Sequence, residues 1–152
     1  MRRSFKILSV IFILAFLPLI QSSAQEKSLY KEGNVWSLTF VRTGANKGIE
    51  YINQLAKTWV ASMEEAKKEG LILDYKILSG NAANAEDYDL ILMIENKSLA
   101  DYDPNPDREA KFDAIEKKIR DDMKGDFQKV VDNYAQIRQI MGTKVMRELH
   151  LK

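Results

Sequence analysis

The 152-residue chain contains no cysteine, one histidine and three prolines. The absence of cysteine excludes disulfides, thiolate metal sites, a cysteine nucleophile and a lipidated N-terminal cysteine. The single histidine, His150, cannot form a site that requires two, and it cannot complete a closed zinc site of four ligands. We therefore expect no bound metal ion and no cofactor.

The chain also lacks an excess of positive or negative charge. The chain has 23 Lys and Arg against 22 Asp and Glu, which gives a formal net charge of +1. Binding to nucleic acid or to anionic lipid rests on clustered Lys and Arg, and no such cluster stands out. The 45% hydrophobic and 30% charged fractions are ordinary for a globular protein. The composition predicts one globular domain without a nucleic-acid partner.

The first 24 residues show the basic, apolar and small-residue regions of a secretory signal peptide, in that order. Three basic side chains among the first six residues precede an apolar run over 7–20, and Gln21-Ser22-Ser23-Ala24 supplies small residues for a signal peptidase. The run is shorter than the ~20 residues that a membrane span requires. We expect residues 1–24 to be removed and the protein to be exported. Its expected location is periplasmic or secreted, and a bacterial envelope fits best. An uncleaved N-terminal anchor is the alternative.

After a flexible lead-in at 25–33, residues 34–152 are predicted to form a single domain. Strands are expected at 35–42, 71–78 and 144–151, where residues alternate between two faces, and at 88–95, where both faces are apolar. Helices are expected where apolar residues recur at helical spacing: from Ile49 until Gly70, and from Arg108 until Gly142 with a break or kink at Gly125. The predicted order is strand, helix, strand, strand, helix, strand.

This order is the split βαβ arrangement of a ferredoxin-like, α+β fold, with both helices on one face of a four-stranded antiparallel sheet. The second face is then left uncovered, and we expect five apolar side chains on it: Val35, Val41, Ile91, Met93 and Met146. At ~25 cal/mol per Å² of apolar area, their exposure costs several kcal/mol. Because two-fold pairing is the commonest oligomer, a homodimer is the expected cover.

The order of elements, the long second helical region and the closing segment from Gly142 to Leu149 (GTKVMREL) resemble dimeric α/β-barrel proteins of the ferredoxin-like superfamily. The likeness is strongest to small exported bacterial members of unassigned function, and it spans about residues 34–152. It implies a barrel-like homodimer. The superfamily includes cofactor-independent monooxygenases, haem-degrading enzymes, isomerases and ligand binders, so the resemblance does not select a function.

No motif in the chain requires a particular reaction. The loop at 101–107 alternates oxygen-bearing side chains as a calcium loop does, but Pro106 and Phe112 stand where an EF-hand needs Gly and Glu. The turn at 44–48 lacks the spacing of a phosphate-binding loop. Asn96-Lys97-Ser98 matches the N-glycosylation pattern by chance unless the host is eukaryotic.

The aromatic side chains are the basis for a ligand-binding hypothesis. We expect them, with one arginine, to line a cavity between sheet and helices that takes a small apolar ligand: Trp36, Phe40, Trp59, Tyr75, Tyr88 and Arg147. Core packing alone explains the same aromatics. The first hypothesis is a non-catalytic homodimer that binds a small ligand or serves as an interaction module.

Two alternatives remain open. One is a cofactor-independent, monooxygenase-like enzyme, which a buried polar cluster in a closed cavity would favour. The other is a haem-handling protein that uses His150 or a tyrosine as ligand. The sequence leaves open whether the protein is an enzyme.

Overall fold

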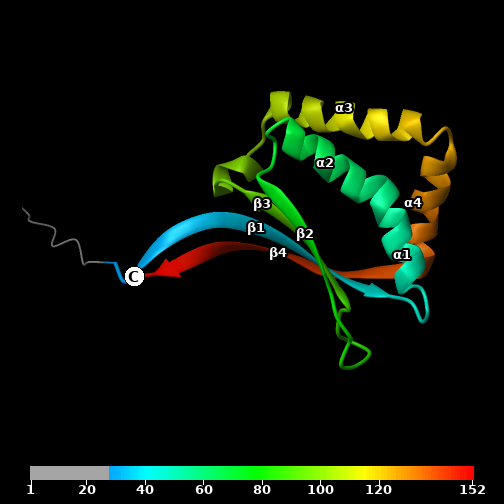
Figure 1. Ribbon diagram of the computed structural model, residues 1–152, viewed down its shortest axis with the longest axis horizontal. Helices are drawn as coiled ribbons and strands as arrows, with labels where there is room; N and C mark the ends of the chain where they lie inside the picture. The colour runs from blue at the N-terminus through cyan, green and yellow to red at the C-terminus, as the bar shows by residue number, and fades with distance from the viewer. Residues whose placement is uncertain (1–27) are drawn as a thin grey trace, which may run out of the picture.

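The computed structural model describes residues 28–152, so the predicted signal peptide lies outside the described residues. The helices gather on one side of a curved sheet, and the long first and last strands run side by side away from them (Figure 1). The elements follow in this order: β1 (Tyr30–Thr43), α1 (Gly48–Leu55), η1 (Ala56–Val60), α2 (Ala61–Lys68), β2 (Asp74–Ser79), β3 (Leu90–Asn96), η2 (Leu99–Tyr102), α3 (Pro106–Asp122), α4 (Asp126–Ile137) and β4 (Arg138–Leu151).

The four strands form one sheet in the order β2-β3-β1-β4, and every neighbouring pair is antiparallel. The two strands that are adjacent in sequence, β2 and β3, pair directly, while β1 lies between β3 and β4. This strand order, with the helices on one face, is the split βαβ arrangement. The predicted ferredoxin-like α+β fold is confirmed.

The first helical region forms one continuous run in which α1, η1 and α2 follow without interruption. The middle part, η1, is a π-helical turn, and such turns widen a helix locally and occur often at functional sites. Within it, Thr58 is buried, and its hydroxyl donates a hydrogen bond to the Gln54 carbonyl at 3.0 Å. The run ends beside Gly70, whose φ of +68° suits glycine, as predicted.

The second helical region is divided where the glycine predicts a break. Lys124 and Gly125 both take positive φ, at +49° and +90°, and this left-handed pair redirects the chain from α3 into α4. The prediction that the helix continues to Gly142 is wrong. The Ile137 carbonyl accepts a hydrogen bond from the Gly44 amide at 2.8 Å, so it is not used by a further helical turn. Residues 138–140 instead pair with the end of β1.

Strand bounds differ from the prediction in three further places, one of them β3, which spans Leu90–Asn96 rather than 88–95. β1 begins at Tyr30 rather than at Val35, because Tyr30 to Glu32 pair with the end of β4. β2 begins at Asp74 rather than at Leu71. Leu71 and Ile72 are buried in a connection, so their apolar character reflects core packing rather than a strand face.

Two clusters of buried side chains make up the core on the helix side of the sheet. The first joins α1 and α4 to the strands: Val41, Tyr51, Leu55, Leu90, Leu92 and Ile137. The second joins α2, α3 and the connection before β2: Met63, Ala66, Leu71, Ile72, Ile115 and Ile119. Trp59 packs against both clusters and links them.

The core also corrects the predicted assignment of faces. Val35 and Val41 are both 0% exposed, and Val41 belongs to the core, so placing them on the uncovered face is wrong. Side chains alternate along a strand, so their neighbours Trp36 and Phe40 point to the opposite side. Sequence alternation identified two faces of β1 but did not say which one the helices cover, because both faces are apolar.

A carboxylate that bridges two helices gives the fold a pH dependence. Glu65 on α2 accepts hydrogen bonds from Lys118 of α3 at 2.7 Å and from Lys68 at 2.8 Å. These two ammonium groups, Lys118 first, lower the pKa of Glu65 from 4.5 to about 2. The folded-state pKa lies below the unfolded value, so the stabilisation is present above the unfolded pKa and is lost as pH falls toward about 2.

We therefore expect the free energy of unfolding to fall between about pH 5 and about pH 2, and to fall less steeply in Glu65→Gln. Urea unfolding across this pH range measures both slopes. Equal slopes in the two proteins would show that this bridge does not stabilise the fold.

Candidate functional site

The sheet face that points away from the helices, termed here the outward face, is apolar at its centre. Cross-strand register arranges it in three rows: Leu78, Ile91 and Phe40; Lys76, Met93, Leu38 and Lys144; Asp74, Glu95, Trp36 and Met146. Leu78 is 50% exposed and Met146 is 55% exposed. Ile91, Met93 and Met146 therefore lie where the sequence placed them.

Aromatic rings and lysines give this face its particular chemistry. The rings of Phe40 and Tyr88 lie 4.7 Å apart, so Tyr88 extends the apolar area beyond the strands. The Lys76 ammonium lies 4.7 Å from the centroid of the Trp36 ring, and the Lys144 ammonium lies 5.8 Å from that of Phe40. Both are cation–π contacts. Within residues 28–152 neither lysine forms an ion pair, so the outward face is an apolar strip bordered by two cations.

The structure does not bring the six predicted ligand-binding residues together. Three of them lie on the outward face: Trp36, Phe40 and Tyr88. Trp59 and Tyr75 meet edge to face at 5.5 Å under the helices, and the Tyr75 hydroxyl donates to Glu64 at 2.5 Å. Arg147 lies near the far end of β4, where its guanidinium is 3.3 Å from Glu32. These residues do not line one cavity between sheet and helices.

A polar cluster that the sequence did not reveal lies under α1 and α4. The Arg138 guanidinium sits 5.4 Å from the centroid of the Tyr51 ring and 4.7 Å from that of Tyr134. The Tyr134 and Thr58 hydroxyls share a short hydrogen bond. Burial raises the pKa of Tyr51 to about 12 and raises that of Tyr134. Both phenols stay protonated at neutral pH, so the cluster offers no general base.

The sequence does not indicate that Arg138 belongs to this cluster, because it predicts a helix at this position. Its Nε atom and the Tyr51 hydroxyl are buried without a hydrogen-bond partner. Buried polar groups usually have partners, and here the Arg138 guanidinium, which lies against the Tyr51 ring, opposes the effect of burial by lowering the pKa of Tyr51.

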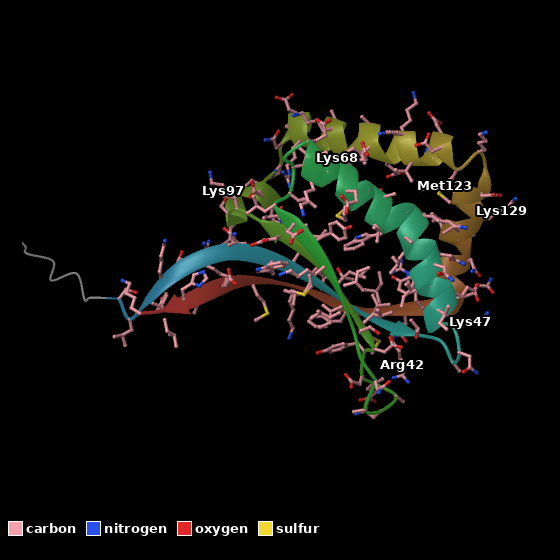
Figure 2. The ribbon with its side chains drawn as sticks, viewed as in Figure 1. Arg42, Lys47, Lys68, Lys97, Met123 and Lys129 are labelled. Atoms are coloured by element: carbon pink, nitrogen blue, oxygen red, sulfur yellow. The ribbon has the colours of Figure 1, made fainter. Side chains whose placement is uncertain are left out.

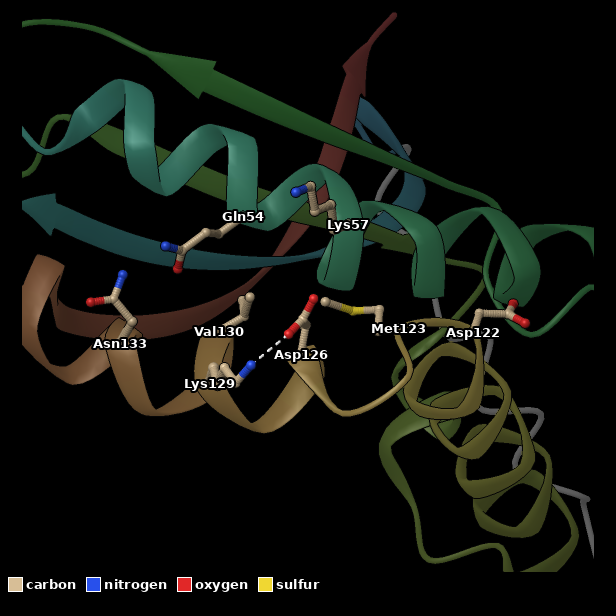
Figure 3. A pocket seen from close by; sticks show the side chains of 8 residues that line it. All are labelled: Gln54, Lys57, Asp122, Met123, Asp126, Lys129, Val130 and Asn133. Atoms are coloured by element: carbon tan, nitrogen blue, oxygen red, sulfur yellow. Dashed lines mark hydrogen bonds and ion pairs between the residues drawn. The ribbon is translucent and has the colours of Figure 1, made fainter.

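A groove of about 700 Å³ lies between the helical run α1–η1 and α4 (Figure 3). Eight side chains line it: Gln54, Lys57, Asp122, Met123, Asp126, Lys129, Val130 and Asn133. Lys129 and Asp126 form an ion pair at 2.8 Å, which lowers the pKa of Asp126. The sequence could not reveal this groove, because it depends on the left-handed turn at 124–125 that positions α4.

The remaining motifs have structural roles. Asn105 caps α3 by accepting a hydrogen bond from the Arg108 amide at 3.0 Å. Asn96 is 4% exposed, and its side chain donates to the Tyr102 hydroxyl at 2.9 Å and accepts from Arg108 at 3.2 Å. Its amide is therefore enclosed by the fold, and the glycosylation pattern at this position is not accessible.

His150 lies on β4 near the chain end, exposed and 3.5 Å from Glu148. Among residues 28–152, no group of three or more His, Cys, Asp and Glu side chains is arranged to hold a metal ion. In the same part of the chain, no helix combines the length and the apolar character needed to cross a membrane.

No family model and no curated protein matches the sequence. Among solved structures, HapK from Hahella chejuensis is similar with a TM-score of 0.44 and 10% identity, over 75% of this chain and 91% of that one. A dimeric ferredoxin-like protein from an uncultured marine organism is similar with a TM-score of 0.41 and 12% identity, over 80% of this chain and 90% of that one. The ferredoxin-like fold of this chain rests on its own strand order.

Proposed function

We propose that this protein is an exported, non-catalytic module that works as a homodimer, in which two subunits pack their outward faces together. The observation that carries the proposal is the apolar centre of that face, where Leu38 and Met93 pair across neighbouring strands. Each Å² of apolar area that a partner covers contributes ~25 cal/mol before association costs are subtracted, so covering this apolar centre favours pairing. The exposed fractions of Leu78 and Met146 show that this area is uncovered within one subunit.

A second copy of the chain suits this face better than an unrelated partner does. Lysines occupy the ends of one row of the face and Glu95 lies in the next row, while Asp74 at the sheet edge is already paired with Lys67 at 2.7 Å. A two-fold axis applies one surface to its own copy, so a face with both signs in separate rows can pair Glu95 with a lysine of the second copy. A face of uniform sign would repel its copy.

The arrangement of polar side chains supports a binding role over an enzymatic one. The expected cavity aromatics fill the core or lie on the outward face. The buried polar cluster at Tyr51 and Arg138 contains no carboxylate or histidine, so it lacks a group that exchanges protons near neutral pH. No specific observation favours the monooxygenase-like alternative.

Sedimentation of residues 25–152 over a wide concentration range tests the dimer. We expect a dimer mass at micromolar concentration and dissociation only on strong dilution. A monomer at every concentration would contradict the proposal. Native mass spectrometry of protein purified from its own host would also detect a ligand that remains bound.

Export gives a separate prediction. The basic start, the apolar run and Ala24 predict cleavage after Ala24. N-terminal sequencing of the exported protein should begin at Gln25 or within a few residues of it. Full-length protein retained in the membrane would show that the segment is an anchor.

A further inference from the structure

The last strand, β4, forms a long free edge of the sheet. It lies at the end of the strand order, so within residues 28–152 only β1 pairs with it, and the backbone groups along its other side have no strand partner. It has 14 residues, whereas β2 at the opposite edge has 6. Short edge strands and prolines protect sheets against pairing with further strands. Because β4 is long and contains no proline, it is open to strand addition.

Exposed apolar side chains accompany this free edge. Those of β4 that are at least 45% exposed are Ile140, Val145, Met146, Leu149 and Leu151. The far half of the strand runs beside β1 away from the helices, which leave it uncovered (Figure 1). A strand added here would hydrogen-bond to the free backbone groups and pack its side chains beside these residues.

The sequence of β4 is complementary to itself in one antiparallel register. A two-fold axis normal to the sheet keeps outward-face side chains on the outward face, so it passes through a residue of the strand. With the axis at Met146, Lys144 lies opposite Glu148 of a second copy, and the symmetry repeats this pair on the other side of the axis. An axis at Lys144 or at Glu148 would instead place two like charges opposite each other.

Both charged groups of this register are available for it. Lys144 and Glu148 are exposed. Among the described residues Lys144 forms no ion pair, and the ion-pair contact of Glu148 is with His150 at 3.5 Å. The pairing would therefore break no existing salt bridge between a lysine or arginine and a carboxylate in residues 28–152.

We propose that two copies of this protein pair antiparallel along β4, with Met146 at the two-fold axis, so that their sheets join into one continuous sheet. Backbone hydrogen bonds hold the two strands together, and the Lys144–Glu148 contacts set the register. This edge interface is separate from the outward face, so together with the proposed homodimer it joins two dimers. A strand edge covers less area than a sheet face, so edge pairing requires the higher protein concentration.

Two cysteines placed on the helix-facing side of β4 test the pairing. In this register Thr143 lies opposite Leu149 of the second copy. Within one strand these positions are ~20 Å apart, too far for a disulfide, which requires Cα atoms within ~7 Å. Residues 25–152 carrying both Thr143→Cys and Leu149→Cys are oxidised mildly at millimolar concentration. We expect a disulfide from position 143 to position 149 of another copy, formed about tenfold faster than any link in either single variant.

Charge reversal tests the register. In the double-cysteine protein, Glu148→Lys places a lysine opposite Lys144 twice, which should slow the linkage about tenfold. Adding Lys144→Glu restores opposite charges and should restore the rate. Glu109→Lys, at an exposed position of α3, is the matched control and should leave the rate unchanged.

Peptide mapping identifies the linked positions, and thermal melts show that each variant is folded. Equal rates in the double-cysteine and single-cysteine proteins, links mainly between identical positions, or no effect of Glu148→Lys would overturn the proposal. So would a failure of the charge-swapped variant to recover. The substituted positions that form the link point away from the outward face, so either result leaves the proposed homodimer to its own sedimentation test.

Discussion

Met93→Asp is expected to convert the dimer into monomers or to make the protein insoluble. Met93 lies at the centre of the outward face, opposite Leu38 on β1 and Lys76 on β2. In the proposed dimer a carboxylate there would be buried against the partner sheet, at a cost of several kcal/mol per ion, and two-fold symmetry applies the cost twice. Sedimentation velocity at a concentration where the parent is a dimer measures the change.

Val131→Asp is the matched control. Val131 is an apolar side chain, 38% exposed on α4, in the helix layer on the other side of the sheet. The same substitution there should leave the dimer intact. If Met93→Asp were a soluble dimer of unchanged stability, the outward face would not be the interface.

Tyr51→Ala is expected to lower the free energy of unfolding by about 3–5 kcal/mol, the range measured for removal of large buried aromatic side chains. Tyr51 is 0% exposed, packs in the first core cluster and meets Tyr134 edge to face at 5.5 Å. Its loss would leave a cavity between α1 and the sheet. Urea unfolding at a fixed protein concentration measures the effect, because the stability of a dimer depends on concentration.

Two further substitutions separate the ring from the hydroxyl. Tyr51→Phe retains the ring and removes a buried hydroxyl without a partner, so it should cost nothing or stabilise by up to about 1 kcal/mol. Ile49→Ala, two residues away and 79% exposed, should change stability by less than about 0.5 kcal/mol. A cost above about 2 kcal/mol for Tyr51→Phe would show that the hydroxyl has a partner in solution.

The fold class was predictable because its signals are local. The apolar run within 88–95 and the helical spacing after Ile49 can each be recognised within a single element. The break at Gly125 was predictable because a glycine by itself weakens a helix and adopts positive φ readily. The end of α4 was not predictable in this way. The spacing of Ile137 and Met141 suits a helix, and the competing hydrogen bond to Gly44 comes from a residue far away in the chain.

The candidate sites depend on tertiary placement and were therefore less predictable. The aromatic residues were correctly identified as apolar, but Trp36 and Trp59 lie on opposite faces of the sheet. Gln54 and Lys57 resemble ordinary surface residues of an amphipathic helix in the sequence. They line a groove only because α4 lies beside them, and the left-handed backbone at 124–125 sets the direction of α4.

The absence of cysteine in the chain allows a direct measurement of the proposed interface. Leu38→Cys and Met93→Cys each place a single thiol at the centre of the outward face. Val131→Cys places one in the helix layer. Figure 2 labels two lysines of that layer, Lys68 and Lys129. We expect mild oxidation to link subunits rapidly through the first two thiols and slowly through the third. Equal linkage at all three positions, or linkage through Val131→Cys alone, would contradict a homodimer formed by the outward faces.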